Sequence, residues 1–181
     1  MNVLILNGST RKKGNTNNSV KLIKDLLAKR GHTYTEINDN VIGCINCAQC
    51  IYDGKCHIED SFSSDVQQNF DWILIVSPIY FFGISGKSKN MLDRLYHLNK
   101  ENIILSSITF SGSDTEESGG FDIIWEQLRR ICDFCDMNLG YSVNFCTYDE
   151  IIEQKDIIKE IENIIVDTEV LYNEIKKDNN K

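Results

Sequence analysis

Short, continuous apolar runs alternate along this chain with longer stretches of helical periodicity. Residues 3–6, 72–76, 103–110 and 141–145 form the runs, which are typical of strands buried on both faces. Segment 33–38 alternates apolar and polar residues and predicts a strand with one partly polar face. Helices are predicted over 17–30, 85–97, 120–135 and 150–176. In the third helix, the apolar residues Phe121, Ile124, Trp125, Leu128, Ile131 and Cys135 recur at helical spacing and predict its core face.

Strands that alternate with helices predict an α/β fold with a parallel sheet and right-handed crossovers. The simplest arrangement is a three-layer, doubly wound, five-stranded parallel sheet of flavodoxin-like order 2-1-3-4-5. The 181 residues suit one domain spanning 1–181. The sole proline, Pro78, is expected to end a strand, and only residues 39–60 lack a clear element. A loop of that length in a compact domain favours a functional explanation.

Charge and cysteine usage narrow the class of protein. A net charge of −8 argues against a nucleic-acid partner, which usually requires a basic patch. No apolar run approaches the roughly 20 residues of a membrane span. Seven cysteines, an odd number, do not suit a fully paired secreted framework, so thiols that are free or metal-bound in the cytoplasm are expected.

The first strand runs into the loop NGSTRKKGNTNN, at the rim where doubly wound sheets bind ligands. Hydroxyls of Ser9, Thr10 and Thr16, with backbone N–H groups at the helix start, would suit a phosphate. The spacing between Gly8 and Gly14 is one residue too long for a nucleotide P-loop, and no GxGxxG is present. The alternative is a loop in which these residues serve only turns and helix caps.

A second loop follows residues 72–76 at the same rim and reads SPIYFFG. Aromatic side chains with nearby backbone N–H groups would suit a flat ring such as isoalloxazine. Aromatic packing beneath a loop is the alternative, but a phosphate loop on the adjacent strand favours a ligand with both a phosphate and a ring.

The stretches GSTRKKGNT and SPIYFFGISGKSKNMLDR resemble the NADPH-dependent FMN reductase and iron–sulfur flavoprotein family. The resemblance implies that the first loop holds the FMN phosphate, that the second lines its ring, and that a third loop also contributes. The implied FMN-binding residues are Ser9, Thr10, Arg11, Gly14, Asn15 and Thr16, then Pro78, Ile79, Tyr80, Phe81, Phe82 and Gly83, then Ser111 and Gly112. Lys89, Asp93 and Arg94 match the family's K-x-x-x-D-R pattern and are interpreted as helix and subunit-contact residues. A homodimer or homotetramer is also implied.

Cys44, Cys47, Cys50 and Cys56 follow the spacing C-x2-C-x2-C-x5-C. Four thiolates in one short loop can bind an iron–sulfur cluster or a zinc ion, or can remain without metal. The spacing resembles the cysteine motif of iron–sulfur flavoproteins, in which these positions ligate a 4Fe–4S cluster. Core packing is expected for Cys132, Cys135 and Cys146, and a polar loop role for His57.

These features predict an FMN-dependent oxidoreductase with no protein acid or base as catalyst, because the flavin carries the chemistry. Electrons would come from NAD(P)H or a ferredoxin-like donor and pass through flavin, with or without a 4Fe–4S cluster, to a quinone, flavin or other acceptor. A non-enzymatic flavin or iron–sulfur electron carrier is the second hypothesis. A zinc-stabilised binding module is the third.

Overall fold

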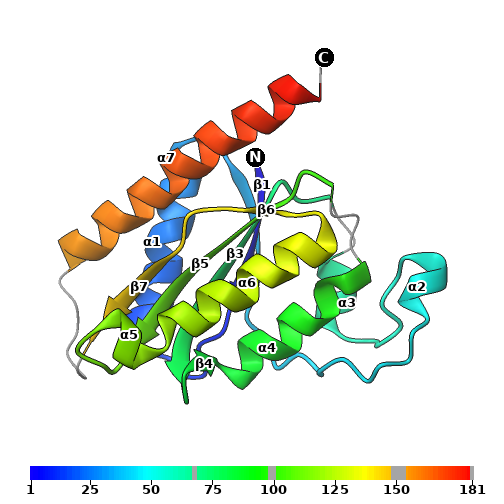
Figure 1. Ribbon diagram of the computed structural model, residues 1–181, viewed down its shortest axis with the longest axis horizontal. Coiled ribbons are helices and arrows are strands. Elements are labelled where there is room, and N and C mark those ends of the chain that lie inside the picture. Colours follow the sequence, from blue (N-terminus) through cyan, green and yellow to red (C-terminus); the bar gives the residue numbers. More distant parts are fainter. Residues whose placement is uncertain (67–68, 98–100, 148–153, 180–181) are drawn as a thin grey trace.

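The computed structural model describes residues 1–66, 69–97, 101–147 and 154–179 (Figure 1). The strands are β1 (Asn2–Asn7), β2 (Thr33–Ile37), β3 (Trp72–Tyr80), β4 (Gly83–Ile84), β5 (Ile104–Ser111), β6 (Asn138–Leu139) and β7 (Val143–Cys146). The helices are α1 (Asn15–Lys29), α2 (Cys50–Asp53), α3 (Ser61–Asp65), α4 (Gly86–Leu92), the 3₁₀ helix η1 (Asp93–His97), α5 (Glu116–Gly119), α6 (Phe121–Cys135) and α7 (Gln154–Asp178).

The predicted flavodoxin-like sheet is confirmed. Its parallel order is β2-β1-β3-β5-β6, and β7 also pairs with β5, so β6 and β7 together take the place of the fifth strand. The longest ladder joins β3 to β5, from the pair Trp72–Ile104 to the pair Pro78–Phe110. Pro78 therefore lies inside β3 and does not end a strand as predicted. The short β4 folds back antiparallel onto the end of β3.

The fifth strand is interrupted at Gly140. A Cβ on this residue would lie 2.3 Å from the Ser106 hydroxyl and 2.7 Å from a methyl carbon of Ile104, so the backbone passes unusually close to β5. Tyr141, predicted as a strand residue, instead lies in the gap between β6 and β7, with 46% of its surface exposed.

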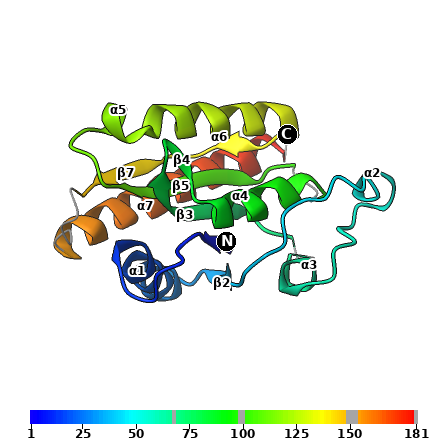
Figure 2. The same cartoon turned by 90° about the horizontal axis from the view of Figure 1, so that it is seen from below.

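Helices cover both faces of the sheet, which gives the three predicted layers. One apolar core forms between the sheet and α3, α4, η1 and α6, and includes Phe62, Met91 and Leu128. The other forms against α1 and α7, and includes Ile23 and Ile161. Figure 2 shows this arrangement, with the segment around α2 projecting beyond the layered body.

Several element boundaries differ from the prediction. Helix α1 begins at Asn15, α4 gives way to η1 at Asp93, and α2, α3 and α5 were not predicted. Residues 150–153 of the predicted last helix lie outside the described residues. Among the helices described, none is long and apolar enough to cross a membrane.

Candidate functional site

The carboxyl ends of β1, β3 and β5 meet at one rim and border a cavity of about 280 Å³. It brings together predicted site residues from all three loops. Its lining consists of Ser9, Arg11, Gly14, Asn15, Thr16, Pro78, Ile79, Tyr80, Phe110, Gly112 and Thr147. The cavity lies where parallel α/β sheets bind their ligands.

Helix α1 begins at this cavity without a side-chain cap. Gly14 precedes the helix with φ of 153°, a conformation that favours glycine, and as the N-cap residue it makes no side-chain cap hydrogen bond. The first turn also carries no acidic residue. The helix start therefore offers backbone donors and the positive end of its dipole to an anion.

Hydrogen bonds fix the loop after β1. The Ser9 amide donates to the Asn7 side chain (3.0 Å), while the Ser9 hydroxyl donates to the Arg11 carbonyl (3.1 Å). The Asn17 side chain also donates to that carbonyl, so the loop is closed upon the first turn of α1. Ser9 and Thr16 are both buried.

The first two loops are joined through the start of α4. Ser85 caps α4 by accepting from the Ser88 amide, and its hydroxyl donates to the Gly8 carbonyl at 2.8 Å. A Cβ on Gly8 would lie 1.8 Å from the Ser88 hydroxyl, so only glycine fits. Lys87 adds a contact from its Nζ to the Ser9 carbonyl (3.0 Å), and burial lowers the pKa of Lys87. The phosphate-type loop and the aromatic loop are thus one hydrogen-bonded unit.

The aromatic loop differs from the predicted shelf. Phe81 and Phe82 form the two-residue turn of the hairpin between β3 and β4, with φ of 50° and 62°, and both are exposed. The lining of the cavity includes Tyr80 but not Phe81, Phe82 or Gly83. Thr10, exposed in the first loop, is also outside the lining.

In the third loop, Gly112 lines the cavity but Ser111 does not. The Ser111 side chain is buried and accepts from the Asn144 side chain (3.1 Å), which ties the ends of β5 and β7 together. Sequence reasoning missed Phe110 and Thr147. Phe110 ends an apolar run next to Ser111, which was a usable signal; Thr147 is brought in only by β7 pairing with β5.

The cysteine loop projects from the layered body and contains α2 (Figures 1 and 2). All four thiols line a second cavity of about 240 Å³, together with His57, Arg94 and Tyr96. Cys44 and Cys47 are exposed, whereas Cys50 and Cys56 are half-buried. Burial, together with the neighbouring Cys47 and Cys56, raises the pKa of Cys50.

Within the described residues, no three His, Cys, Asp or Glu side chains converge closely enough to hold a metal ion. His57 instead hydrogen-bonds to Asp53 at 2.6 Å, in keeping with the predicted polar loop role. The donor set fits an iron–sulfur cluster in chemistry, since four soft thiols share one cavity and each iron of a cubane needs only one of them. Binding of a cluster would therefore require the thiols to come closer together than they lie here.

Arg94 was interpreted as a helix and subunit-contact residue, but it is buried in this chain, with only 2% of its surface exposed. Burial opposes its charge, but hydrogen bonds to Asp60 and to the sulfur of Cys56 raise the pKa of Arg94. Lys89 and Asp93, by contrast, form an exposed ion pair on α4 and η1.

Cys132 lies in the core, as predicted, and burial raises its pKa to about 12. Cys135 packs against the same core. Cys146 lies at the end of β7, where its sulfur accepts from the Asn144 side chain at 3.4 Å.

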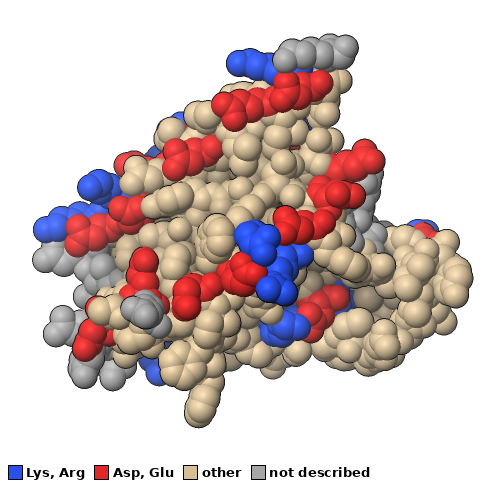
Figure 3. Space-filling view, viewed as in Figure 1, with Lys and Arg blue, Asp and Glu red and all other residues tan. Residues whose placement is uncertain are grey.

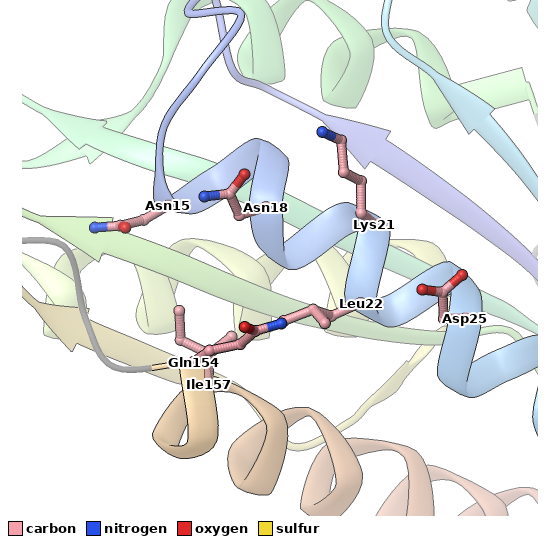
Figure 4. A pocket seen from close by; sticks show the side chains of 7 residues that line it. All are labelled: Asn15, Asn18, Lys21, Leu22, Asp25, Gln154 and Ile157. Carbon is pink, nitrogen blue, oxygen red and sulfur yellow. The ribbon is translucent and has the colours of Figure 1, made fainter.

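A third cavity, of about 510 Å³, separates the start of α1 from the start of α7 (Figure 4). Asn18 and Lys21 line it from α1, and Gln154 and Ile157 line it from α7. Only Asn15 belongs both to this cavity and to the rim cavity, so the predicted site residues gather at the rim.

Comparison with known proteins agrees with this geometry. The NADPH-dependent FMN reductase family model matches residues 1–139. An iron–sulfur flavoprotein of Methanocaldococcus jannaschii is 32% identical over 99 residues, which cover 52% of this chain and 51% of that protein. The chain thus matches only about half the length of this curated relative.

Solved structures share the fold at low sequence identity. RosB with bound 8-demethyl-8-formylriboflavin-5′-phosphate aligns with a TM-score of 0.67 and 13% identity, covering 98% of this chain and 81% of that one. The NAD(P)H:quinone oxidoreductase of Methanothermobacter marburgensis gives 0.63 and 15%, covering 96% of each chain. A flavodoxin of Streptococcus pneumoniae TIGR4 gives 0.62 and 11%, covering 94% and 99%. With a family match over most of its length and a flavodoxin-like sheet, the chain belongs to the NADPH-dependent FMN reductase family.

Proposed function

We propose that this protein is an FMN-dependent oxidoreductase that takes electrons from NAD(P)H or a ferredoxin-like donor. The observation that carries the proposal is the uncapped start of α1, which opens on a cavity shared by three rim loops. A helix start without a side-chain cap or an acidic first turn favours a phosphate group. The family match supports FMN as the molecule that carries this phosphate.

FMN, when bound, would accept hydride from a nicotinamide and pass electrons on singly or in pairs. The chain binds and orients it. The first-turn N–H groups of α1 and the loop around Ser9 would hold the phosphate, while Ile79, Tyr80 and Gly112 would lie along the ring. The hydrogen bonds from Ser85 and Lys87 to the first loop keep these two parts of the site at a fixed spacing.

We further propose that Cys44, Cys47, Cys50 and Cys56 ligate a 4Fe–4S cluster in the native protein, which would carry single electrons. Support comes from the four thiols around one cavity and from the iron–sulfur flavoprotein relative. None of the seven cysteines forms a disulfide in the described residues, which suits a reducing compartment such as the cytoplasm. A quinone, a free flavin or another small molecule is the proposed acceptor, and an NAD(P)H:quinone oxidoreductase shares the fold.

The phosphate site is tested by a pair of matched substitutions in α1. Asn15→Asp adds a carboxylate at the rim cavity, where it would repel a phosphate but still suit the helix dipole. Asn18→Asp adds the same charge to an exposed position outside that cavity. We expect Asn15→Asp to weaken FMN binding by about tenfold or more, and Asn18→Asp by less than about twofold.

Riboflavin, which lacks the phosphate, serves as the ligand control and should bind both variants equally. Equal FMN affinity in the two variants would overturn the phosphate assignment.

Anaerobic turnover of NADH or NADPH with a quinone distinguishes an enzyme from an electron carrier, because a carrier would be reduced only by a protein donor. Iron and sulfide analysis of anaerobically purified protein tests the cluster.

We also propose a homodimer or homotetramer. Figure 3 shows a band of alternating positive and negative side chains across the face formed by α4 and α6. Ile123 and Phe134 are exposed and line one surface hollow with the charged residues Lys89, Asp93, Glu126 and Arg130, and Phe134 stacks on Tyr96. Apolar side chains bordered by charges of both signs can pair with the same surface of a second copy.

A further inference from the structure

One polar face of the α4–η1 segment holds the start of the cysteine loop. The side chains of Lys87, Asn90 and Arg94 follow at intervals of three and four residues, which places them on the same side of a helix. Lys87 Nζ donates to the Asn38 carbonyl (2.7 Å), and Asn90 donates to the Val41 carbonyl (3.2 Å). Residues 38–42, the first stem of the loop, are thus bound to successive turns of this segment, and residues 58–60 form the returning stem.

Arg94 is the point at which the two stems of the loop meet. Its Nη1 donates to the Ile42 carbonyl of the first stem at 3.1 Å. Its Nη2 donates to the Ile58 carbonyl of the returning stem at 3.3 Å and to the Asp60 carboxylate at 2.9 Å. One guanidinium therefore binds residues on both sides of the four cysteines.

Asp60 completes this closure. Its second carboxylate oxygen also accepts from Arg94, so the pair is bidentate, and the same carboxylate accepts from the amides of Ile42 (3.3 Å) and Ser63 (3.2 Å). It is thereby the N-cap of α3 as well. The Arg94 guanidinium lies 4.6 Å from the centre of the Phe62 ring, which leaves it little freedom to move.

Arg94 is also part of the wall of the thiol cavity. It lines that cavity together with Cys44, Cys47, Cys50 and Cys56, so the side chain that joins the two ends of the loop also bounds the space between the thiols.

From these contacts we infer that Arg94 is a positioning residue for the cysteine centre: its bidentate pair with Asp60 closes the base of the loop that carries the four cysteines. The inference rests on the proposed cysteine centre, but closure of the loop is a property of the chain itself. A lysine cannot replace the guanidinium, because a single ammonium group cannot span both stem carbonyls and the carboxylate.

Thiol alkylation tests the closure without any metal. Four proteins are treated with a chelator and then reacted with iodoacetamide: wild type, Arg94→Lys, Asp60→Asn and the control Arg130→Lys. The Arg130 side chain is 74% exposed on α6. Mass spectrometry gives the rate at each cysteine. We expect Arg94→Lys and Asp60→Asn to raise the rates at Cys50 and Cys56 about tenfold, towards those of Cys44 and Cys47, and the control to change them less than twofold. FMN affinity and the far-ultraviolet circular dichroism spectrum show whether each variant folds.

Anaerobically purified protein supplies the second measurement. Arg94→Lys should retain FMN but lose at least half of its iron, because an open loop base no longer holds the four thiols around one centre. Unchanged alkylation rates in folded Arg94→Lys would overturn the inference. If wild-type protein contains FMN but no iron, the cluster proposal fails, while the alkylation rates still decide the role of Arg94.

Discussion

Phe81 and Phe82 occupy a conformation that aromatic residues rarely adopt. Both central residues of this two-residue hairpin turn have positive φ, a combination usually supplied by Asn-Gly or a similar pair. The strain is retained at the edge of the candidate flavin cavity, beside Tyr80. Strain of this kind points to a functional use of the two phenyl rings.

Replacement of the turn by Phe81→Asn with Phe82→Gly should stabilise the protein by about 1 kcal/mol, because the new residues suit positive φ. FMN affinity should fall at the same time if the rings close over the rim. Urea unfolding and FMN titration measure the two effects. Tyr52→Asn, at an exposed aromatic residue in the short helix α2, is the control and should give no gain in stability. A loss of stability in the turn variant would contradict the strain argument.

At the scale of elements, the gap in the fifth strand begins at Gly140, where the backbone passes close to β5. Gly140→Ala should destabilise the protein by about 1–3 kcal/mol, because the new methyl group would overlap Ser106 and Ile104 of β5. Gly86→Ala at the start of α4 is a matched control, since its Cβ would meet nothing within 4 Å. It should be neutral or stabilise by up to about 1 kcal/mol. Thermal unfolding of both variants distinguishes them, and equal effects would show that the close approach is unimportant.

The sheet was predictable because its central strands β1, β3 and β5 are buried on both faces and are rich in apolar residues. The helix α6 shows the limit of such patterns. Trp125 was assigned to its core face but is 42% exposed, whereas Cys132 is 3% exposed. Helical spacing alone does not show whether an apolar residue at the edge of the stripe packs in the core or lies exposed, where it could contact a second copy.

The rim loops of the site were also predictable, since each follows a buried strand. Thr147 and the role of Arg94 were not. Arg94 lies 34 residues from Asp60 in sequence, and the pairing depends on how α3 and η1 pack together on the sheet. A buried guanidinium requires a partner, but the sequence does not identify which carboxylate supplies it.

At the scale of the whole molecule, one carboxylate connects α7 to the opposite end of the chain. Glu169 pairs with Arg30, which follows α1 (3.0 Å), and with His32 (2.8 Å), whose other ring nitrogen lies 3.1 Å from the N-terminal amine. The hydrogen bond from Arg30 has the largest effect and lowers the pKa of Glu169. Burial opposes this effect, and the hydrogen bond from His32 lowers the pKa further, so it stays below its ordinary value. A lowered pKa in the folded state means that the stabilisation is present above the unfolded pKa and is lost on acidification.

Glu169→Gln should therefore destabilise the protein by about 0.5–1 kcal/mol at neutral pH, a modest amount because the pair is partly exposed. The difference from wild type should shrink as the pH falls from about 5 to about 3. Urea unfolding at several pH values measures it, with Glu174→Gln, an exposed residue of the same helix, as the control. A difference independent of pH would contradict the proposed ion pair.

Self-association should depend on the face formed by α4 and α6. Ile123→Glu with Phe134→Glu places charges on its exposed apolar residues and should convert an oligomer to a monomer. Val170→Glu, at a 53% exposed position on α7, should leave the assembly unchanged. Sedimentation velocity gives the mass of each species, and an oligomer that survives the double substitution would require a different interface.

Because both stems of the cysteine loop meet at Arg94, residues 43–57 leave and rejoin the fold at a single side chain. The sheet and its two cores involve none of these residues, so their number and chemistry can change without disturbing the scaffold. A loop of different length and side chains, or a short linker, can be joined to the same stems. The buried arginine thus marks a point at which the loop can be exchanged on this scaffold during evolution or by design.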